Sequence, residues 1–136
     1  MMDNILNNSS KYADLARQYE FDRTRWDKDK VQCLMGLKNA IETFSVGKGY
    51  SIELSDGKEP CININPDVQS GRIRKRTAGV YAAPTKGMVS IVLNMNTYVN
   101  LKNKYELPDC KLKNNQYSCS IDFCELCSFV EAIISL

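Results

Sequence analysis

The sequence predicts an α+β domain, in which an antiparallel sheet of about five strands is covered by a long N-terminal helix and a C-terminal helix. Two observations support this prediction. Apolar residues recur at helical spacing near both ends of the chain, and short alternating segments joined by turn residues occupy the middle. With 136 residues, the chain is expected to form one domain over residues 11–136, after a disordered polar tail at 1–10.

Residues 11–44 carry one helical stripe whose phase continues from end to end. Tyr12, Leu15 and Tyr19 lie on the same side as Trp26 and as the apolar positions of 33–44. We prefer one helix of about 50 Å, because a loop would normally reset the phase; the alternative is two helices broken near 21–24. A single helix would exceed the domain diameter of roughly 30 Å, so 11–30 would project as an arm.

The exposed stripe of that arm predicts an interaction surface. Its members are Tyr12, Leu15, Tyr19 and Trp26. Large apolar side chains are usually buried against something, and the simplest cover is the same stripe on a second copy. The sequence therefore predicts a homodimer through the N-terminal helix.

Turn residues divide the middle of the chain into hairpins. The Pro84 and Gly87 positions favour a turn between strands at 80–83 and 88–95, and the second strand should be buried on both faces. The Asp56-Gly57 pair joins alternating strands at 50–54 and 61–65. A short helix over 97–106 and an Asn114-Asn115 turn then precede a last strand at 117–121.

The final helix has a start signal and an unbroken apolar stripe. Asp122 and Glu125 have the spacing of a capping box, although Asp replaces the usual Ser or Thr. The apolar stripe that follows, over 123–134, predicts that this helix lies on the sheet.

Basic residues are concentrated in one segment, residues 70–87, which holds no acid. The remainder of the chain has a slight acidic excess, so the net charge of +2 arises entirely from this segment. In an extended loop, Arg72, Arg74 and Arg76 would point to one side, at a spacing that suits successive phosphates. The predicted partner is nucleic acid or an acidic protein surface; the alternative is a solvated loop that serves solubility. The candidate binding residues are Arg72, Arg74, Lys75, Arg76 and Lys86.

Catalysis is uncertain, and the sequence favours a protein that is not an enzyme. The chain has no histidine, which excludes nucleophile–histidine catalysis and histidine metal sites. The alternative function is a metal-dependent nuclease of the PD-(D/E)xK type, whose residue order is matched by Asp67, Asp109 and Lys111. No cofactor is predicted.

Four cysteines fall close together near the C-terminus and include one CxxC pair. Thiolates at such spacing can hold zinc, but strand alternation and the helix stripe explain these positions as core cysteines. We therefore predict no metal site and no redox role for the CxxC. The four residues are Cys110, Cys119, Cys124 and Cys127.

Composition predicts a cytoplasmic protein. No window approaches the ~18 apolar residues of a membrane span, and the N-terminus has neither a basic nor an apolar signal region. A chain of this size with 43% apolar residues does not need disulfides to fold, so its six cysteines are expected to be reduced.

The helix at 31–44, the hairpin at 80–95, the polar strand at 117–121 and the closing helix at 123–134 resemble a small domain family. That family consists of uncharacterised "predicted transport protein" domains, often fused to or encoded beside nucleases. The similarity is one of pattern, over about 90 residues, and the aromatic-rich central strand of the family is replaced here by residues 79–83. The resemblance implies the α+β fold and favours a function that involves nucleic acids. High Asn, Lys and Ile usage is typical of AT-rich genomes and fits a bacterial or phage protein. The setting we expect for its binding function is defence or counter-defence.

Overall fold

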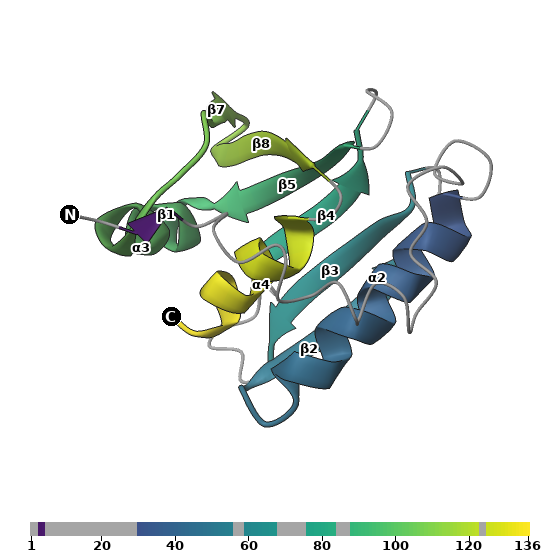
Figure 1. Ribbon diagram of the computed structural model, residues 1–136. Coiled ribbons are helices and arrows are strands. Elements are labelled where there is room, and N and C mark those ends of the chain that lie inside the picture. The colour runs from purple at the N-terminus through teal and green to yellow at the C-terminus, as the bar shows by residue number, and fades with distance from the viewer. Residues whose placement is uncertain (1–2, 5–29, 56–58, 68–75, 84–87, 123–124) are drawn as a thin grey trace.

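The computed structural model describes residues 3–4, 30–55, 59–67, 76–83, 88–122 and 125–136. In this part of the chain, an antiparallel sheet of six strands is accompanied by three helices, so the predicted α+β class is confirmed (Figure 1). The elements are β1 (Asp3–Asn4), α2 (Lys30–Ser45), β2 (Tyr50–Ser55), β3 (Cys61–Pro66), β4 (Ala78–Ala82), β5 (Met88–Asn94), α3 (Met95–Lys104), β6 (Tyr105–Glu106), β7 (Lys111–Lys113), β8 (Gln116–Asp122) and α4 (Leu126–Ile134).

The main sheet has the strand order β2-β3-β4-β5-β8-β7, and every neighbouring pair is antiparallel. The two predicted hairpins, β2–β3 and β4–β5, are both confirmed. The chain leaves β5 through α3 and returns along β7 and β8, which places β8 beside β5. A separate short parallel pair joins β1 to β6.

The prediction of about five strands was wrong by one strand of the main sheet. The additional strand is β7, which forms a hairpin with β8 across the predicted Asn114-Asn115 turn. Both asparagines have positive φ, 53° and 62°, as a two-residue hairpin turn of this kind requires. β7 carries a single apolar residue, Leu112, and that side chain is 59% exposed. The strand therefore has no alternation that the sequence could reveal.

The sheet buries one face and keeps polar residues on the other. On β3, Ile62 and Ile64 are fully buried, as predicted, whereas Asn63 and Asn65 lie on the opposite face. β5 follows the same rule, with buried residues at every second position. Our prediction that this strand is buried on both faces was therefore wrong, because its serine and asparagine positions share the polar face.

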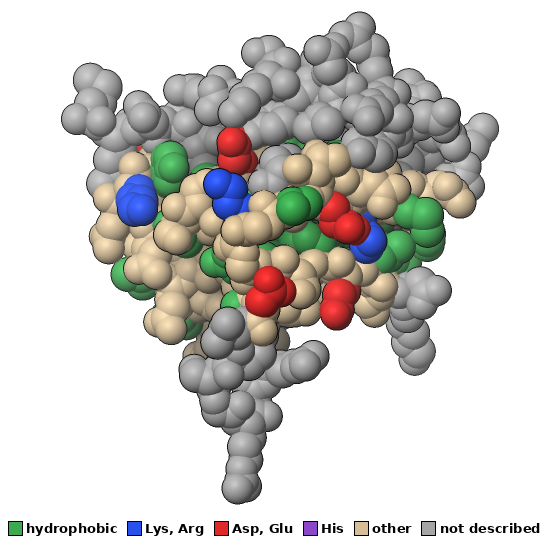
Figure 2. Space-filling model, turned by 90° about the horizontal axis from the view of Figure 1, so that it is seen from below, with side chains coloured by type: hydrophobic (Ala, Val, Ile, Leu, Met, Phe, Trp, Pro, Cys, Tyr) green, Lys and Arg blue, Asp and Glu red, His purple; other side chains and the backbone are tan. Residues whose placement is uncertain are grey.

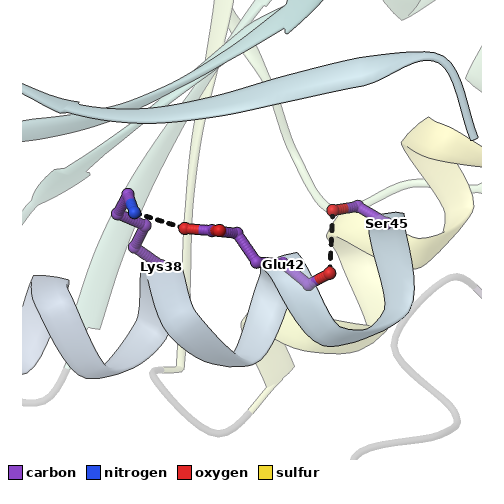
Figure 3. Close-up of polar contacts among 3 residues, drawn as sticks. All are labelled: Lys38, Glu42 and Ser45. Atoms are coloured by element: carbon purple, nitrogen blue, oxygen red, sulfur yellow. Dashed lines mark hydrogen bonds and ion pairs between the residues drawn. The ribbon is translucent and has the colours of Figure 1, made fainter. Parts of the chain in front are cut away.

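The described N-terminal helix is α2, which is 16 residues long and corresponds to the C-terminal half of the predicted helix. Residues 11–29, and with them the choice between one helix and two, lie outside the described residues. α2 packs against β2, β3 and α4. Along this helix, the partly exposed Lys38 and Glu42 form an ion pair, and the hydroxyl of the buried Ser45 donates to the Glu42 carbonyl at 3.4 Å (Figure 3). Gly47 follows with φ 75°, a conformation that ends helices and favours glycine.

Helix α4 lies over the buried face and completes the core. It begins at Leu126, after Glu125, whose side chain makes no cap hydrogen bond; the predicted capping box from Asp122 spans residues 123–124, which lie outside the described residues, and stays a prediction. The largest fully buried side chains come from α2, α3, α4 and the sheet: Phe129, Leu34, Leu37, Ile41, Ile62, Ile64, Ile91, Leu93, Leu101, Leu126 and Ile133. Among the described residues, no helix is both long enough and apolar enough to cross a membrane.

Candidate binding surface around Arg76

Arg76 is the candidate binding residue that the structure describes, and its guanidinium folds back onto the polar face of the sheet. Nη1 donates to the Asn63 side-chain oxygen at 2.9 Å and to the Tyr81 hydroxyl at 2.6 Å. The guanidinium carbon lies 5.2 Å from the centroid of the Tyr81 ring, within the range of a cation–π contact. Arg76 is therefore held by β3 and β4 together, and it is half-buried.

Gly79 makes this position possible. It pairs with Asn63 in the β3–β4 ladder, and its missing side chain leaves room for the arginine. A Cβ at Gly79 would lie 2.6 Å from the guanidinium carbon of Arg76 and 3.1 Å from Nε. Glycine inside a strand commonly marks such a close approach. Any other residue here would have to displace the arginine.

The backbone beside Arg76 is fixed by a second set of hydrogen bonds. The Asn94 side chain donates to the Arg76 carbonyl at 3.0 Å and accepts from the Thr97 amide at 2.8 Å, which makes it the N-cap of α3. The Thr77 amide donates to the Ile64 carbonyl at 2.7 Å. The C-terminal end of the basic segment, which we define as residues 72–76, is thus tied to β3, to β5 and to α3.

The remaining members of the predicted site lie outside the described residues. Arg72, Arg74 and Lys75 precede the anchored Arg76 directly in the chain, and Lys86 belongs to the connection between β4 and β5. The two connections depart from opposite ends of β4, which are roughly 14 Å apart at the usual rise of a strand. The predicted interaction surface Tyr12, Leu15, Tyr19 and Trp26 also lies outside the described residues.

Charge on the described surface is mixed. On the face seen in Figure 2, basic and acidic side chains are scattered among hydrophobic and other side chains, and neither sign forms a large patch of its own. Over the described ranges as a whole, acidic residues slightly outnumber basic ones. The concentration of basic residues in the sequence therefore has no counterpart in the described part of this face.

The three residues of the nuclease alternative do not meet. Asp67 follows β3, where it accepts a hydrogen bond from the Ser51 hydroxyl at 2.5 Å. Lys111 begins β7 at the edge of the sheet, and Asp109 precedes it by two residues. β4, β5 and β8 separate β3 from β7, a distance of roughly 19 Å at the usual strand spacing. Within the described ranges, no group of three His, Cys, Asp or Glu residues is placed to hold a metal ion.

The cysteines occupy the positions expected of core residues. Cys119 in β8 and Cys127 in α4 are buried, with 4% and 2% exposure, and Cys110 is half-buried. Burial raises the pKa of the Cys127 thiol to about 12, so this residue is inert at neutral pH. Cys124 lies outside the described residues.

Sequence reasoning missed the partners that hold Arg76: Asn63, Gly79, Tyr81 and Asn94. A signal was present, because an isolated glycine within a strand predicts a close contact. To know that Arg76 is the residue that approaches Gly79, one needs the β3–β4 register, which the sequence does not provide.

Comparison with known proteins adds no further constraint: no protein-family model, no curated protein and no solved structure matches this chain.

Proposed function

We propose that this chain is a binding protein without catalytic activity, which docks through the basic segment on nucleic acid or on an acidic protein surface. Nucleic acid is the preferred partner, since guanidinium groups at alternate positions of an extended chain can each engage one phosphate with two parallel hydrogen bonds. Contacts of this kind give affinity without reading a base sequence.

The observation that carries the proposal is the anchoring of Arg76. A binding segment whose last residue is already immobilised on the sheet loses less conformational freedom on binding than a segment whose residues are all free to move. Because Nη1 of Arg76 already bonds to Asn63 and Tyr81, we assign Arg76 a positioning role. The contacts to the partner are assigned to Arg72, Arg74 and Lys75.

The test is a charge reversal that spares the anchor. Arg72→Glu/Arg74→Glu/Lys75→Glu should weaken binding to fluorescent mixed-sequence DNA and RNA by at least about tenfold. The matched control is Lys104→Glu/Lys111→Glu/Lys113→Glu, which makes the same change of charge at exposed lysines of α3 and β7. Fluorescence anisotropy reports the affinities, and circular dichroism checks that both variants remain folded.

The outcomes separate the two classes of partner. A loss that is confined to the basic-segment variant supports the proposal. Equal losses in both variants would indicate attraction by overall charge and contradict a local site. If the wild-type protein binds neither DNA nor RNA, the nucleic-acid partner is excluded, and the same pair of variants is used against proteins that co-purify from the native host.

We further propose that residues 11–30 mediate self-association. The support is the sequence stripe of Tyr12, Leu15, Tyr19 and Trp26, whose large side chains each gain about 1.5–3 kcal/mol on leaving water. A twofold arrangement would bury the same stripe of both copies.

A further inference from the structure

Two cysteines face each other across the edge of the sheet. The β7–β8 ladder pairs Lys111 with Ser118, so the next position along both segments sets Cys110 opposite Cys119. Directly opposite residues of an antiparallel pair have Cα atoms about 4.5–5.5 Å apart. Disulfides span Cα separations of about 4.4–6.8 Å. Continued one residue beyond the ladder, this register gives the backbone spacing that a cross-strand disulfide needs.

The surroundings of the two thiols agree with this placement. Each side chain perturbs the pKa of the other, and the Cys110 thiol donates a hydrogen bond to the Pro108 carbonyl oxygen, 3.2 Å away. Both cysteines are reduced in this structure. A bond between them thus requires no change in the pairing of β7 with β8.

The pair has a division of roles that suits stepwise oxidation. Side-chain hydrogen bonding with Cys119 lowers the pKa of Cys110, against the opposing effects of burial and of the Asp109 charge. The same hydrogen bond, together with burial, raises the pKa of Cys119. Since thiolate is the reactive form, the half-buried Cys110 reacts first, and the buried Cys119 stands beside it as the second thiol.

We propose that Cys110 and Cys119 form a redox-responsive dithiol, which hydrogen peroxide converts to an intramolecular disulfide. The Cys110 thiolate attacks one peroxide oxygen and becomes a sulfenic acid while hydroxide leaves. The Cys119 sulfur then attacks the Cys110 sulfur, the S–O bond breaks, and water leaves with the Cys119 proton. In total, two thiols and one peroxide give one disulfide and two waters. In a reducing compartment, such a bond is transient.

The disulfide would change the edge of the sheet. β7 is an edge strand that the main sheet holds through β8 alone, and its side chains are exposed. A bond between Cys110 and Cys119 would fasten the chain before β7 to β8 and close a short loop around the hairpin. Oxidation should therefore slow hydrogen exchange of the β7 amides, an effect that a surface modification of Cys110 alone would not produce.

The experiment oxidises the full-length wild-type protein and maps its thiols. After reductant is removed, one equivalent of hydrogen peroxide is added, free thiols are alkylated, and tryptic peptides are analysed by mass spectrometry. The expected product is a linked pair of peptides covering 105–111 and 114–136, lighter by two hydrogens than the two reduced peptides together. Fragmentation must place the bond on Cys119, because the second peptide also contains Cys124 and Cys127.

Single-cysteine variants show which thiol is oxidised first and which thiol then forms the disulfide. Cys119→Ser should stop the reaction at a sulfenic acid on Cys110 that dimedone labels, and Cys110→Ser should abolish the disulfide. Cys127→Ser is the matched control, a buried thiol whose loss should leave the bond between Cys110 and Cys119 unchanged. A bond between Cys124 and Cys127, a disulfide between two chains, or full alkylation of Cys119 after peroxide treatment of the wild type would each overturn the proposal. The wild-type mapping decides the matter even where a variant does not fold.

Discussion

The guanidinium of Arg76 occupies the space that a side chain at Gly79 would fill. A Cβ at Gly79 would lie 2.6 Å from the guanidinium carbon, well inside van der Waals contact. The two residues therefore depend on each other: glycine admits the arginine to the surface of the sheet, and the arginine covers the glycine backbone, which is buried. This relationship anchors the basic segment and can be measured by a double-mutant cycle.

Gly79→Ala should destabilise the fold by about 1–3 kcal/mol, because the methyl group expels the guanidinium and breaks its hydrogen bonds to Asn63 and Tyr81. In an Arg76→Ala background, the same change should be neutral or slightly stabilising, since alanine costs less conformational entropy than glycine in a strand. Urea denaturation of the four proteins gives the coupling energy. Equal effects of Gly79→Ala in both backgrounds would show that the two residues are independent.

Replacing Ser128 by alanine should stabilise the protein. It lies in α4 with 4% exposure, and its hydroxyl is buried without a hydrogen-bond partner. An unsatisfied buried hydroxyl is costly, and alanine is the better helix former, so Ser128→Ala should raise the free energy of unfolding by about 1 kcal/mol. The control is Ser90→Ala, which breaks a 3.2 Å hydrogen bond to Ser118 and should not stabilise. A loss of stability in Ser128→Ala would indicate that its hydroxyl is satisfied.

The N-terminal stripe predicts a dimer in solution. Leu15→Glu/Tyr19→Glu places charges where two copies would meet, so this variant should be monomeric under conditions in which the wild type is dimeric. Light scattering after gel filtration measures the mass of both proteins. A wild-type protein that is monomeric at high micromolar concentration contradicts self-association and favours two helices folded back on each other.

The hairpins of this fold are predictable from the sequence because local chemistry determines them. Asn114 and Asn115 tolerate positive φ, and the alternation on either side of the Asp56-Gly57 turn assigns Ile62 and Ile64 to the core. β7 could not be predicted in this way, since Leu112 and its two flanking lysines carry no burial signal. The strand exists because β8 offers an unpaired edge beside the turn.

The candidate site was predictable in composition and unpredictable in geometry. A concentration of basic residues without acids is visible in the sequence, and Arg76 is part of it. Its attachment to Asn63 and Tyr81 depends on the register of β3 against β4 and on the close approach at Gly79. Cys110 and Cys119 illustrate the same limit, since they face each other only once β7 is recognised as a strand.

The measurement that tests the central claim most directly is the salt dependence of nucleic-acid binding. Neutralising phosphates releases counterions, so the logarithm of the association constant should fall linearly with the logarithm of the salt concentration, by about 0.7–0.9 per phosphate contacted. Arg72→Glu/Arg74→Glu/Lys75→Glu should make this slope shallower by about two to three, whereas Lys104→Glu/Lys111→Glu/Lys113→Glu should leave it nearly unchanged. A slope that is the same in the wild type and in the basic-segment variant would contradict the claim that this segment contacts the phosphates.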